Sequence, residues 1–353
     1  MVQFGSRRVG DAEPVFITFE AGPTHNGLES AKRLVSCAAK AGGDAVKFQL
    51  FDPDRLVADR SQLFEFDILV NRETGETKTV KEPLYDLFVR RALTREEWRA
   101  LKAHADSVGV AFFATAGFLD EIDFLAELKC ASFKIASSDV NHLPLIRHVA
   151  RTGMCLQLDT GNSTIGEIEA AIDVIRAESN ENIIIHHCPS GYPARLTGIN
   201  LNIISTLRRM FPYPVAFSDH SPGWDMDVAA VALGANLIEK TITEDRMTPS
   251  VEHIFSIEPV DMKRFVMTMR DLQVALGSRR RVMHPEEIKK RQAVRRSVYL
   301  AAPAKRGEKL GKVAVEFRRP GFGLSPTDYE RLIDRPLAAD FPAGHRLDLG
   351  DLA

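Results

Sequence analysis

The stretch LIEKTITEDRMTPSVEH, residues 237–253, begins as an apolar run and ends in charged and polar residues. Its first residues read as a short strand in which apolar side chains are nearly continuous, as in strands covered on both faces. Glu239 and Thr241 are two positions apart, so a strand places their carboxylate and hydroxyl on the same face. The stretch therefore predicts a buried strand that delivers polar groups at its carboxyl end.

Seven earlier runs have the same character, and amphipathic helical patterns lie between them. The strand candidates are residues 15–21, 45–50, 110–115, 132–137, 155–160, 182–187, 214–219 and 236–241. Eight strands that alternate with helices over about 260 residues have the size and rhythm of a (β/α)8 TIM barrel. A doubly wound open sheet is the alternative, but eight units of nearly equal length favour closure.

Helix ends are marked by local signals. Thr94 and Glu97, and likewise Thr164 and Glu167, have the spacing of capping boxes at helix starts. Gly109 follows a helical pattern at the position of a C-terminal cap.

The 353 residues suit a large α/β domain and a smaller one. We predict a barrel domain at 1–280, a charged connecting segment at 281–294 and a small β-rich domain at 295–353. The longest irregular stretch, 51–93, follows the second strand and is either a mobile lid or a solvated insertion.

The composition excludes several classes of protein. The formal net charge of −2 does not indicate wholesale binding to nucleic acid or to an anionic membrane. Four cysteines without CxxC spacing indicate reduced, buried thiols. Neither a signal peptide nor an apolar run long enough to cross a bilayer is visible, so we expect a cytoplasmic protein.

Nearly every strand candidate ends in a polar residue, and in a barrel these ends form the active face. The residues are Glu20, Lys47, Gln49, Thr115, Lys134, Ser137, Asp159, His187, Ser218, Asp219, His220, Glu239 and Thr241. Any single one of them is more often a polar residue whose hydrogen bonds are made within the protein. Polar residues at the ends of eight strands together favour a catalytic or ligand-binding site. The lysines and hydroxyls suit a phosphate, and the carboxylates suit hydroxyl groups or proton transfer. His220 is the best single candidate for a metal ligand.

Several motifs follow one another in a specific order. They are FEAGPTHNG (19–27), DAVKFQ (44–49), FKIASSD (133–139), LDTGN (158–162), HHCPSGYP (186–193), FSDHS (217–221), ALGANLIEKTIT (232–243) and RRPGFG (318–323). In these residues the chain resembles the N-acetylneuraminate (sialic acid) synthase family over almost its whole length. The family condenses phosphoenolpyruvate with an N-acetylated hexose to give nine-carbon 2-keto sugar acids. The tail resembles its small antifreeze-like (SAF) domain.

The resemblance implies roles for particular residues. Lys47, Thr115, Lys134, Ser137 and Ser218 would hold phosphoenolpyruvate, and Glu20 would orient groups or transfer protons. His220 would bind a divalent metal ion, Mn²⁺ or Mg²⁺, while Gln49, Tyr192 and Glu239 would contact the sugar. Asp219 is a further substrate-binding candidate. Arg319, from the antifreeze-like domain of a partner subunit, would reach the N-acyl group, which implies a domain-swapped homodimer.

The chain also departs from the family pattern. Thr241 stands in place of a second metal-binding histidine, and Asp159 in place of a serine near the phosphate. Ser190 replaces an asparagine, Asp139 a glutamate, and Glu252 an aspartate that contacts sugar hydroxyls. Either His220 holds a weakened metal site with Asp159 or His253 as second ligand, or the site is independent of metal, or Thr241 makes room for a differently substituted sugar.

Three hypotheses follow. The first is a phosphoenolpyruvate-dependent synthase that makes a sialic-acid-like nonulosonic acid for a surface glycan and releases phosphate by C–O cleavage. The second is a catalytically altered or silent paralogue that binds the sugar or phosphoenolpyruvate. The third is a barrel aldolase or isomerase that acts on another sugar.

Overall fold

The computed structural model describes residues 1–11 and 13–353. The chain divides into two compact units, residues 1–277 and residues 278–353. Each unit is described by itself below.

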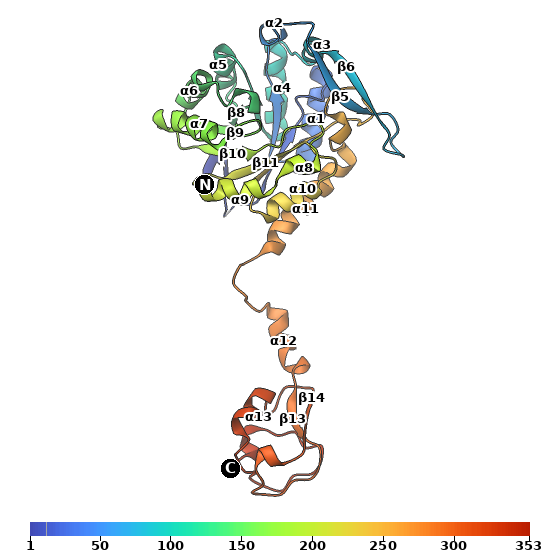
Figure 1. Ribbon diagram of the computed structural model, residues 1–353, viewed down its shortest axis with the longest axis vertical. Helices are drawn as coiled ribbons and strands as arrows, with labels where there is room; N and C mark the ends of the chain where they lie inside the picture. The colour runs from blue at the N-terminus through green and yellow to red at the C-terminus, as the bar shows by residue number, and fades with distance from the viewer. Residues whose placement is uncertain (12) are drawn as a thin grey trace. The chain divides into compact units, whose positions relative to one another are not determined.

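The first unit is a closed barrel of eight parallel strands, which confirms the predicted TIM-barrel fold (Figure 1). The strands are β3 (Phe16–Glu20), β4 (Ala45–Gln49), β7 (Ala111–Thr115), β8 (Ser132–Ile135), β9 (Cys155–Asp159), β10 (Ile183–His187), β11 (Val215–Asp219) and β12 (Leu237–Thr241). Each strand pairs with the next along the chain, and β12 closes the barrel against β3. All eight predicted strands are therefore present and in sequence order.

Helices follow the strands and cover the outside of the barrel (Figure 1). They are α1 (Leu28–Ala41), α4 (Arg95–Val108), α5 (Leu119–Glu127), α6 (Leu143–Arg151), α7 (Ile165–Ala177), α8 (Leu196–Ile199), α9 (Asn202–Met210), α10 (Asp225–Ala232) and α11 (Pro259–Leu276). The capping boxes at Thr94 and Thr164 are both formed. Gly109 ends α4 at a φ of 75°, a left-handed conformation that glycine adopts without strain.

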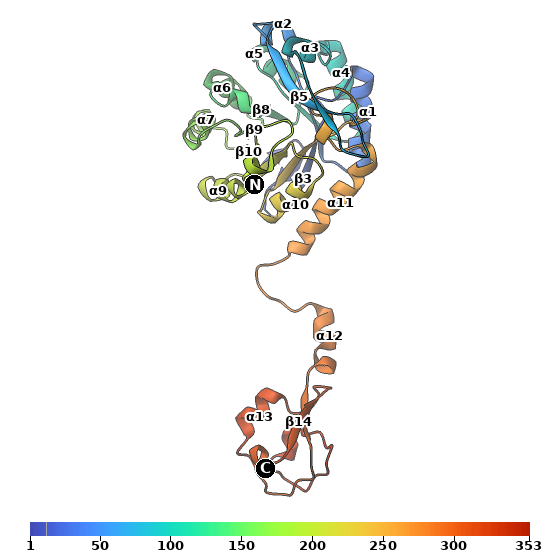
Figure 2. The same cartoon turned by 45° about the vertical axis from the view of Figure 1, so that its right-hand side comes forward.

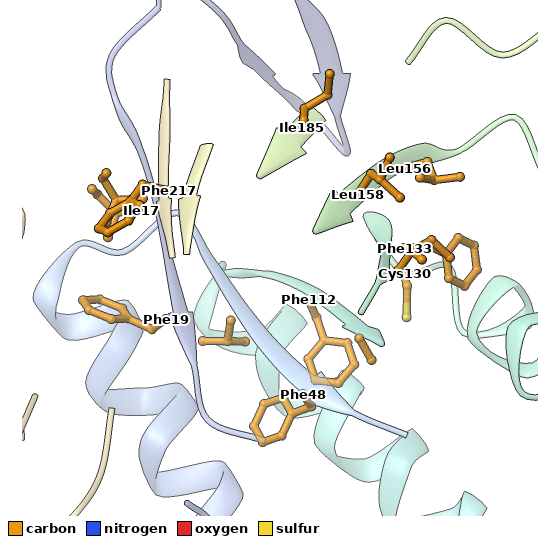
Figure 3. Packing of buried hydrophobic residues seen from close by; sticks show 14 of the residues in the cluster. Ile17, Phe19, Phe48, Phe112, Cys130, Phe133, Leu156, Leu158, Ile185 and Phe217 are labelled. Carbon is orange, nitrogen blue, oxygen red and sulfur yellow. The ribbon is translucent and has the colours of Figure 1, made fainter. Parts of the chain in front are cut away.

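Alternate residues of the strands face the helices and form the main apolar core. Figure 3 shows Ile17, Phe19, Phe48, Phe112 and Phe217, which are buried under the surrounding helices. The opposite faces point into the barrel. At the amino ends of the strands these inward residues are apolar and pack against Phe4, whose ring lies 4.6 Å from that of Phe16.

Phe4 belongs to a hairpin of β1 (Val2–Phe4) and β2 (Arg7–Val9), which the sequence did not predict. The amino end of the barrel is thus closed by apolar side chains. Polar inward residues are left at the carboxyl ends of the strands, where a site was expected.

The stretch 51–93 is more regular than predicted. It contains α2 (Pro53–Leu56), an antiparallel hairpin of β5 (Leu63–Leu69) and β6 (Thr77–Pro83), and α3 (Leu84–Val89). Phe66 and Leu87 form a buried cluster with Val251 from the loop after β12, and Arg72 bonds to Asp245 in the same loop at 2.8 Å. The hairpin can be followed beside the barrel in Figure 2. It therefore packs on the barrel unit instead of forming a structureless loop.

The second unit contains α12 (Pro285–Val294), a two-stranded antiparallel sheet of β13 (Ser297–Leu300) and β14 (Val315–Arg318), and α13 (Pro326–Leu332). Two short 3-10 helices, Leu310–Lys312 and Leu349–Asp351, also belong to this unit. Two others, Ser137–Asp139 and His253–Phe255, belong to the first unit. The second unit has its own apolar cluster, which includes Val298, Leu310 and Leu347. The predicted connecting segment is largely occupied by α12. Across residues 1–11 and 13–353, every helix is too short or too polar to cross a membrane.

Candidate active site

A cavity of about 430 Å³ opens at the carboxyl ends of the barrel strands. We call it the strand-end cavity. Twelve predicted residues line it: Glu20, Lys47, Gln49, Thr115, Ser137, Asp139, Asp159, Tyr192, Ser218, His220, Glu239 and Glu252. Lys134 lies fully buried beneath its floor. The structure therefore brings most of the candidate residues to one place.

Parallel register explains this convergence. Glu20 on β3 is the neighbour of Lys47 on β4, and Thr115 on β7 is the neighbour of Lys134 on β8. Ser218 on β11 likewise lies beside Glu239 on β12. Because neighbouring residues of parallel strands share a face, these polar side chains all point into the barrel.

Two lysines and three carboxyl groups form a network at the cavity floor. The Lys134 ammonium donates to Glu239 Oε1 at 2.6 Å, to Ser218 Oγ at 3.4 Å, and lies 3.0 Å from Asp159 Oδ1. Lys47 donates to the same Glu239 oxygen at 3.1 Å and to Glu20. All five charged residues are buried, so the network is shielded from solvent. We call it the lysine–carboxylate network.

The carboxyl groups of this network differ in acidity. Burial acts to raise the pKa of Glu239, but Lys134 and Lys47 outweigh it and hold that pKa below its ordinary value. Burial prevails at the other two, so the pKa values of Glu20 and Asp159 are raised despite the lysines. Glu239 is thus a permanent carboxylate, whereas Glu20 and Asp159 are the groups able to take up or release a proton.

Glu20 is also held in place by the backbone. The Gly22 N–H donates to its Oε1 at 2.6 Å. A Cβ atom at Gly22 would lie 2.6 Å from that same oxygen, so a larger residue would displace the carboxylate. This explains the glycine in the motif that follows the first barrel strand.

His186 and His187 are consecutive residues of one strand, so their side chains point to opposite faces of the barrel wall. His186 faces inward, fully buried, with Nδ1 3.7 Å from Asp159 Oδ1 and Nε2 2.8 Å from Gln157 Oε1. Burial keeps its pKa well below the ordinary value, so the ring is neutral. His187, which the sequence singled out, instead faces outward and donates to the Ile199 carbonyl at 2.6 Å. The inward group beside Asp159 is therefore His186.

Asp219 needs the same correction. It follows the inward Ser218 directly, so its side chain points out of the barrel toward α10. There it accepts from Lys240 and from Ser221, close to the buried Asp227. Asp219 does not line the strand-end cavity, so the structure does not support its prediction as a substrate-binding residue.

Three other candidates lie outside the cavity lining. Thr241 is buried and bonds to Glu252 Oε2 at 3.3 Å. Ser190 is exposed and donates to Asn162 Oδ1 at 2.7 Å, so that it supports a lining residue. Arg319 is an exposed residue of the second unit, and its role remains a prediction.

The residues present do not form a metal site of the expected kind. His220 is buried between the rings of Tyr192 and Phe255, and burial lowers its pKa to about 4, which leaves a neutral imidazole able to bind a metal. Of the suggested second ligands, Asp159 is paired with Lys134, and His253 Nδ1 lies 2.7 Å from the Thr243 hydroxyl. Within the described ranges, no three His, Cys, Asp or Glu side chains are grouped to hold a metal ion. Neither suggested second ligand is therefore free to join His220.

Sequence reasoning missed one side of the cavity. An apolar wall comes largely from the inserted segment, with Phe51, Phe64, Leu84, Leu87 and Phe88, and continues to Val251. Arg91 and Asn162 add polar groups that were not predicted. The alternation of apolar residues in LFEFDILV was the signal that could have shown a strand there.

Glu252 lies on the same side of the cavity as this wall. It is half-buried at a φ of 70°, in the left-handed region, and desolvation together with repulsion from Glu20 raises its pKa to about 7. Its carboxyl group therefore changes charge near neutral pH.

A closed parallel barrel with lysines, carboxyl groups and hydroxyls gathered at its strand ends defines a (β/α)8-barrel enzyme. The NeuB family profile matches residues 34–281, and the chain belongs to this family. It is 33% identical to the N,N'-diacetyllegionaminic acid synthase of Legionella pneumophila, over 97% of this chain and 96% of that protein.

Solved structures agree with this assignment. The N-acetylneuraminic acid (sialic acid) synthetase of Leptospira borgpetersenii, in complex with citrate, is 28% identical with a TM-score of 0.71, over 82% of this chain and 94% of that one. The spore coat polysaccharide biosynthesis protein SpsE of Bacillus subtilis is 31% identical with a TM-score of 0.66, over 99% of this chain and 98% of that one. The predicted resemblance to the sialic acid synthase family is confirmed.

Proposed function

We propose that this enzyme condenses phosphoenolpyruvate with an N-acylated hexose to give a nonulosonic, sialic-acid-like 2-keto acid and phosphate, for a surface glycan. The observation that carries the proposal is the lysine–carboxylate network at the strand ends of a NeuB-family barrel. Its buried ammonium groups suit a small polyanion, and its carboxyl groups suit proton transfer.

Phosphoenolpyruvate is proposed to bind at the cavity floor. Lys47 and Lys134 supply positive charge, while Thr115, Ser137 and Ser218 supply hydroxyls. The Ser137 hydroxyl is buried and has no hydrogen-bond partner among the described residues, so it is free to donate to the ligand. A donor of this kind favours an anion at the floor.

Asp159 fits this binding mode when it is protonated. Burial raises its pKa, so its carboxyl group can donate a hydrogen bond to a phosphate oxygen, as a serine hydroxyl would. The departure from the family pattern then preserves a donor at this place instead of adding repulsion.

The reaction forms a C–C bond and, from water, a C–O bond at C2, and it breaks the C–O bond to phosphate. The two protons of that water end on the former aldehyde oxygen and on the phosphate. The enol carbon of phosphoenolpyruvate attacks the open-chain aldehyde of the sugar, and positive charge develops at C2. Water adds there, and the tetrahedral intermediate expels phosphate. Glu20, held by Lys47 and Gly22, is placed to accept the proton of this water. The permanent carboxylate of Glu239 stabilises the positive charge at C2 and orients both lysines.

The acceptor sugar is proposed to bind toward the cavity mouth, against Gln49, Tyr192 and Glu252. Asp139 also lines this cavity and is available to a sugar hydroxyl. The resemblance further implies a homodimer in which Arg319 of one subunit reaches the site of the other, and we include this in the proposal.

The test is consumption of phosphoenolpyruvate and release of phosphate over a panel of N-acylated hexoses. We expect turnover with at least one acceptor, and we expect Glu20→Gln to lower kcat roughly 100-fold or more while binding of phosphoenolpyruvate persists. Binding without turnover would favour a silent paralogue. Full activity of Arg319→Ala would favour an aldolase or isomerase, and neither binding nor turnover would refute the proposal.

A further inference from the structure

Arg91 is a buried cation in the wall of the strand-end cavity. It follows α3 in the inserted segment, and its backbone N–H donates to the Phe88 carbonyl at 2.9 Å. Its side chain lines the cavity, although only 7% of the residue is exposed. The guanidinium is thus presented to the cavity interior and not to bulk solvent.

Among the described residues, no carboxylate is paired directly with this guanidinium, although Glu252 and Glu82 act on it from a longer distance. Nη2 donates to the Ser250 hydroxyl at 3.0 Å, but across residues 1–11 and 13–353 no carboxylate oxygen forms a salt bridge with it within 4.0 Å. The preceding Arg90, by contrast, forms two hydrogen bonds to Glu82 at 2.7 and 2.8 Å. A buried guanidinium without a directly paired carboxylate is costly, and a carboxylate or phosphate matches its planar set of donors.

The other cations of the cavity do not share this property. Lys47 and Lys134 are both engaged by carboxyl groups of the lysine–carboxylate network. Arg91 also comes from a different part of the chain. Ser250, which it contacts, directly precedes Val251 of the apolar wall and Glu252, which is proposed to bind the acceptor. An anion at Arg91 therefore belongs to the acceptor and not to phosphoenolpyruvate.

We propose that the acceptor sugar of this enzyme carries an anionic substituent, a carboxylate or a phosphate, and that the Arg91 guanidinium binds it. This inference rests on the proposed function and specifies its substrate class. Arg91 is a specificity residue in this view: it determines which acceptor binds and takes no part in bond formation.

The experiment compares three acceptors: an N-acetylhexosamine, its 6-phosphate, and the corresponding uronic acid. Consumption of phosphoenolpyruvate gives kcat/KM for the wild type, Arg91→Gln, Arg91→Lys and the control Arg90→Gln, which changes a surface arginine of the same segment. We expect the wild type to prefer one charged acceptor. Arg91→Gln should lower kcat/KM for it roughly 10- to 100-fold, mostly through KM, and should change the value for the neutral sugar less than about twofold.

The two charged sugars distinguish a phosphate from a carboxylate. Arg91→Lys should recover part of the loss, Arg90→Gln should behave as the wild type, and the dissociation constant of phosphoenolpyruvate should be unchanged in Arg91→Gln. A wild type that uses only neutral acceptors would overturn the proposal. So would an equal loss for charged and neutral sugars, or weakened binding of phosphoenolpyruvate in Arg91→Gln. Absence of turnover with every acceptor in a wider panel would count against the proposed function itself.

Discussion

Glu252 shows how one half-buried residue of the cavity links the site to stability. Its ordinary pKa of 4.5 is raised to about 7 in the folded protein, first by desolvation and then by repulsion from Glu20, while Arg91 opposes the shift. Between these two pH values the folded chain holds a proton that the unfolded chain has lost. The free energy of unfolding therefore falls as the pH rises through this window.

We predict that Glu252→Gln removes this dependence. In the wild type, Glu252 should lower the free energy of unfolding by roughly 3 kcal/mol between pH 4.5 and pH 7, because each unit of pKa shift corresponds to about 1.4 kcal/mol. Chemical denaturation of the variant at a series of pH values should give a flatter curve. The exposed Glu96→Gln serves as control, and parallel curves for wild type and Glu252→Gln would contradict the assignment.

A second prediction concerns Thr241, which occupies the place of an expected metal ligand. Because Asp159 is paired with Lys134 and His253 contacts Thr243, neither is free to join His220, and the wild type should bind Mn²⁺ weakly. Thr241→His should tighten binding about tenfold or more, as followed by electron paramagnetic resonance of free Mn²⁺. The gain should vanish in Thr241→His with His220→Ala. Tight binding by the wild type would show that the ligands lie elsewhere.

Strand periodicity allowed most of the inward residues to be predicted, since Lys47, Lys134 and Glu239 lie on continuous buried strands. Periodicity did not identify Asp219 and His187 as outward-facing residues. Each follows an inward residue directly, and a polar residue at the end of a strand does not by itself show whether it faces the barrel interior or the helices. Arg91 could not be found in this way, because its place depends on long-range packing of the inserted segment.

At the scale of elements, the β5–β6 hairpin is the part that the sequence predicted least well. Its strands pair residue by residue from Leu63 opposite Pro83 to Leu69 opposite Thr77. Phe66 is buried against Leu87 and Val251, which joins the hairpin to the loop that carries Glu252. The sequence of β6 is mostly polar and therefore does not indicate a strand that packs on the barrel. Val80 is its only apolar residue before Pro83, and it packs against the Phe66 cluster. The hairpin therefore helps to shape the acceptor side of the cavity.

We predict that Phe66→Ala loosens the hairpin. Loss of a buried phenyl ring costs roughly 3 to 5 kcal/mol, which is enough to favour local detachment. Trypsin should cleave after Arg72 or Lys78 much faster than in the wild type, and the KM for the acceptor should rise more than the KM for phosphoenolpyruvate. Leu63→Ala, at a residue that is 61% exposed, is the control. Equal cleavage rates in both variants would show that Phe66 does not anchor the hairpin.

At the scale of the whole molecule, the chain consists of two units with separate apolar clusters, residues 1–277 and residues 278–353. The alternating pattern of strands and helices predicted the first unit well. The second contains few regular elements and many short turns, so its internal arrangement could not be inferred from periodicity.

The proposed homodimer gives a prediction at this scale. If each site combines a barrel with Arg319 of the partner subunit, Glu20→Gln and Arg319→Ala inactivate different parts of it. Mixed dimers then contain one intact site, so a reassorted equal mixture should recover about a quarter of wild-type activity. Activity no higher than the mean of the two variants would show that each site is built from one chain. Mixing without subunit exchange is the control.

The lysine–carboxylate network has a consequence for the energetics of ligand binding. Its three carboxyl groups already exceed its two ammonium groups, and Glu20 and Asp159 have raised pKa values before any ligand arrives. A polyanion such as phosphoenolpyruvate raises them further, so its binding should draw protons from the buffer. Titration calorimetry in buffers of different ionisation enthalpy should therefore report net proton uptake. Association should weaken as the solution becomes more alkaline, which makes substrate capture a proton-consuming step.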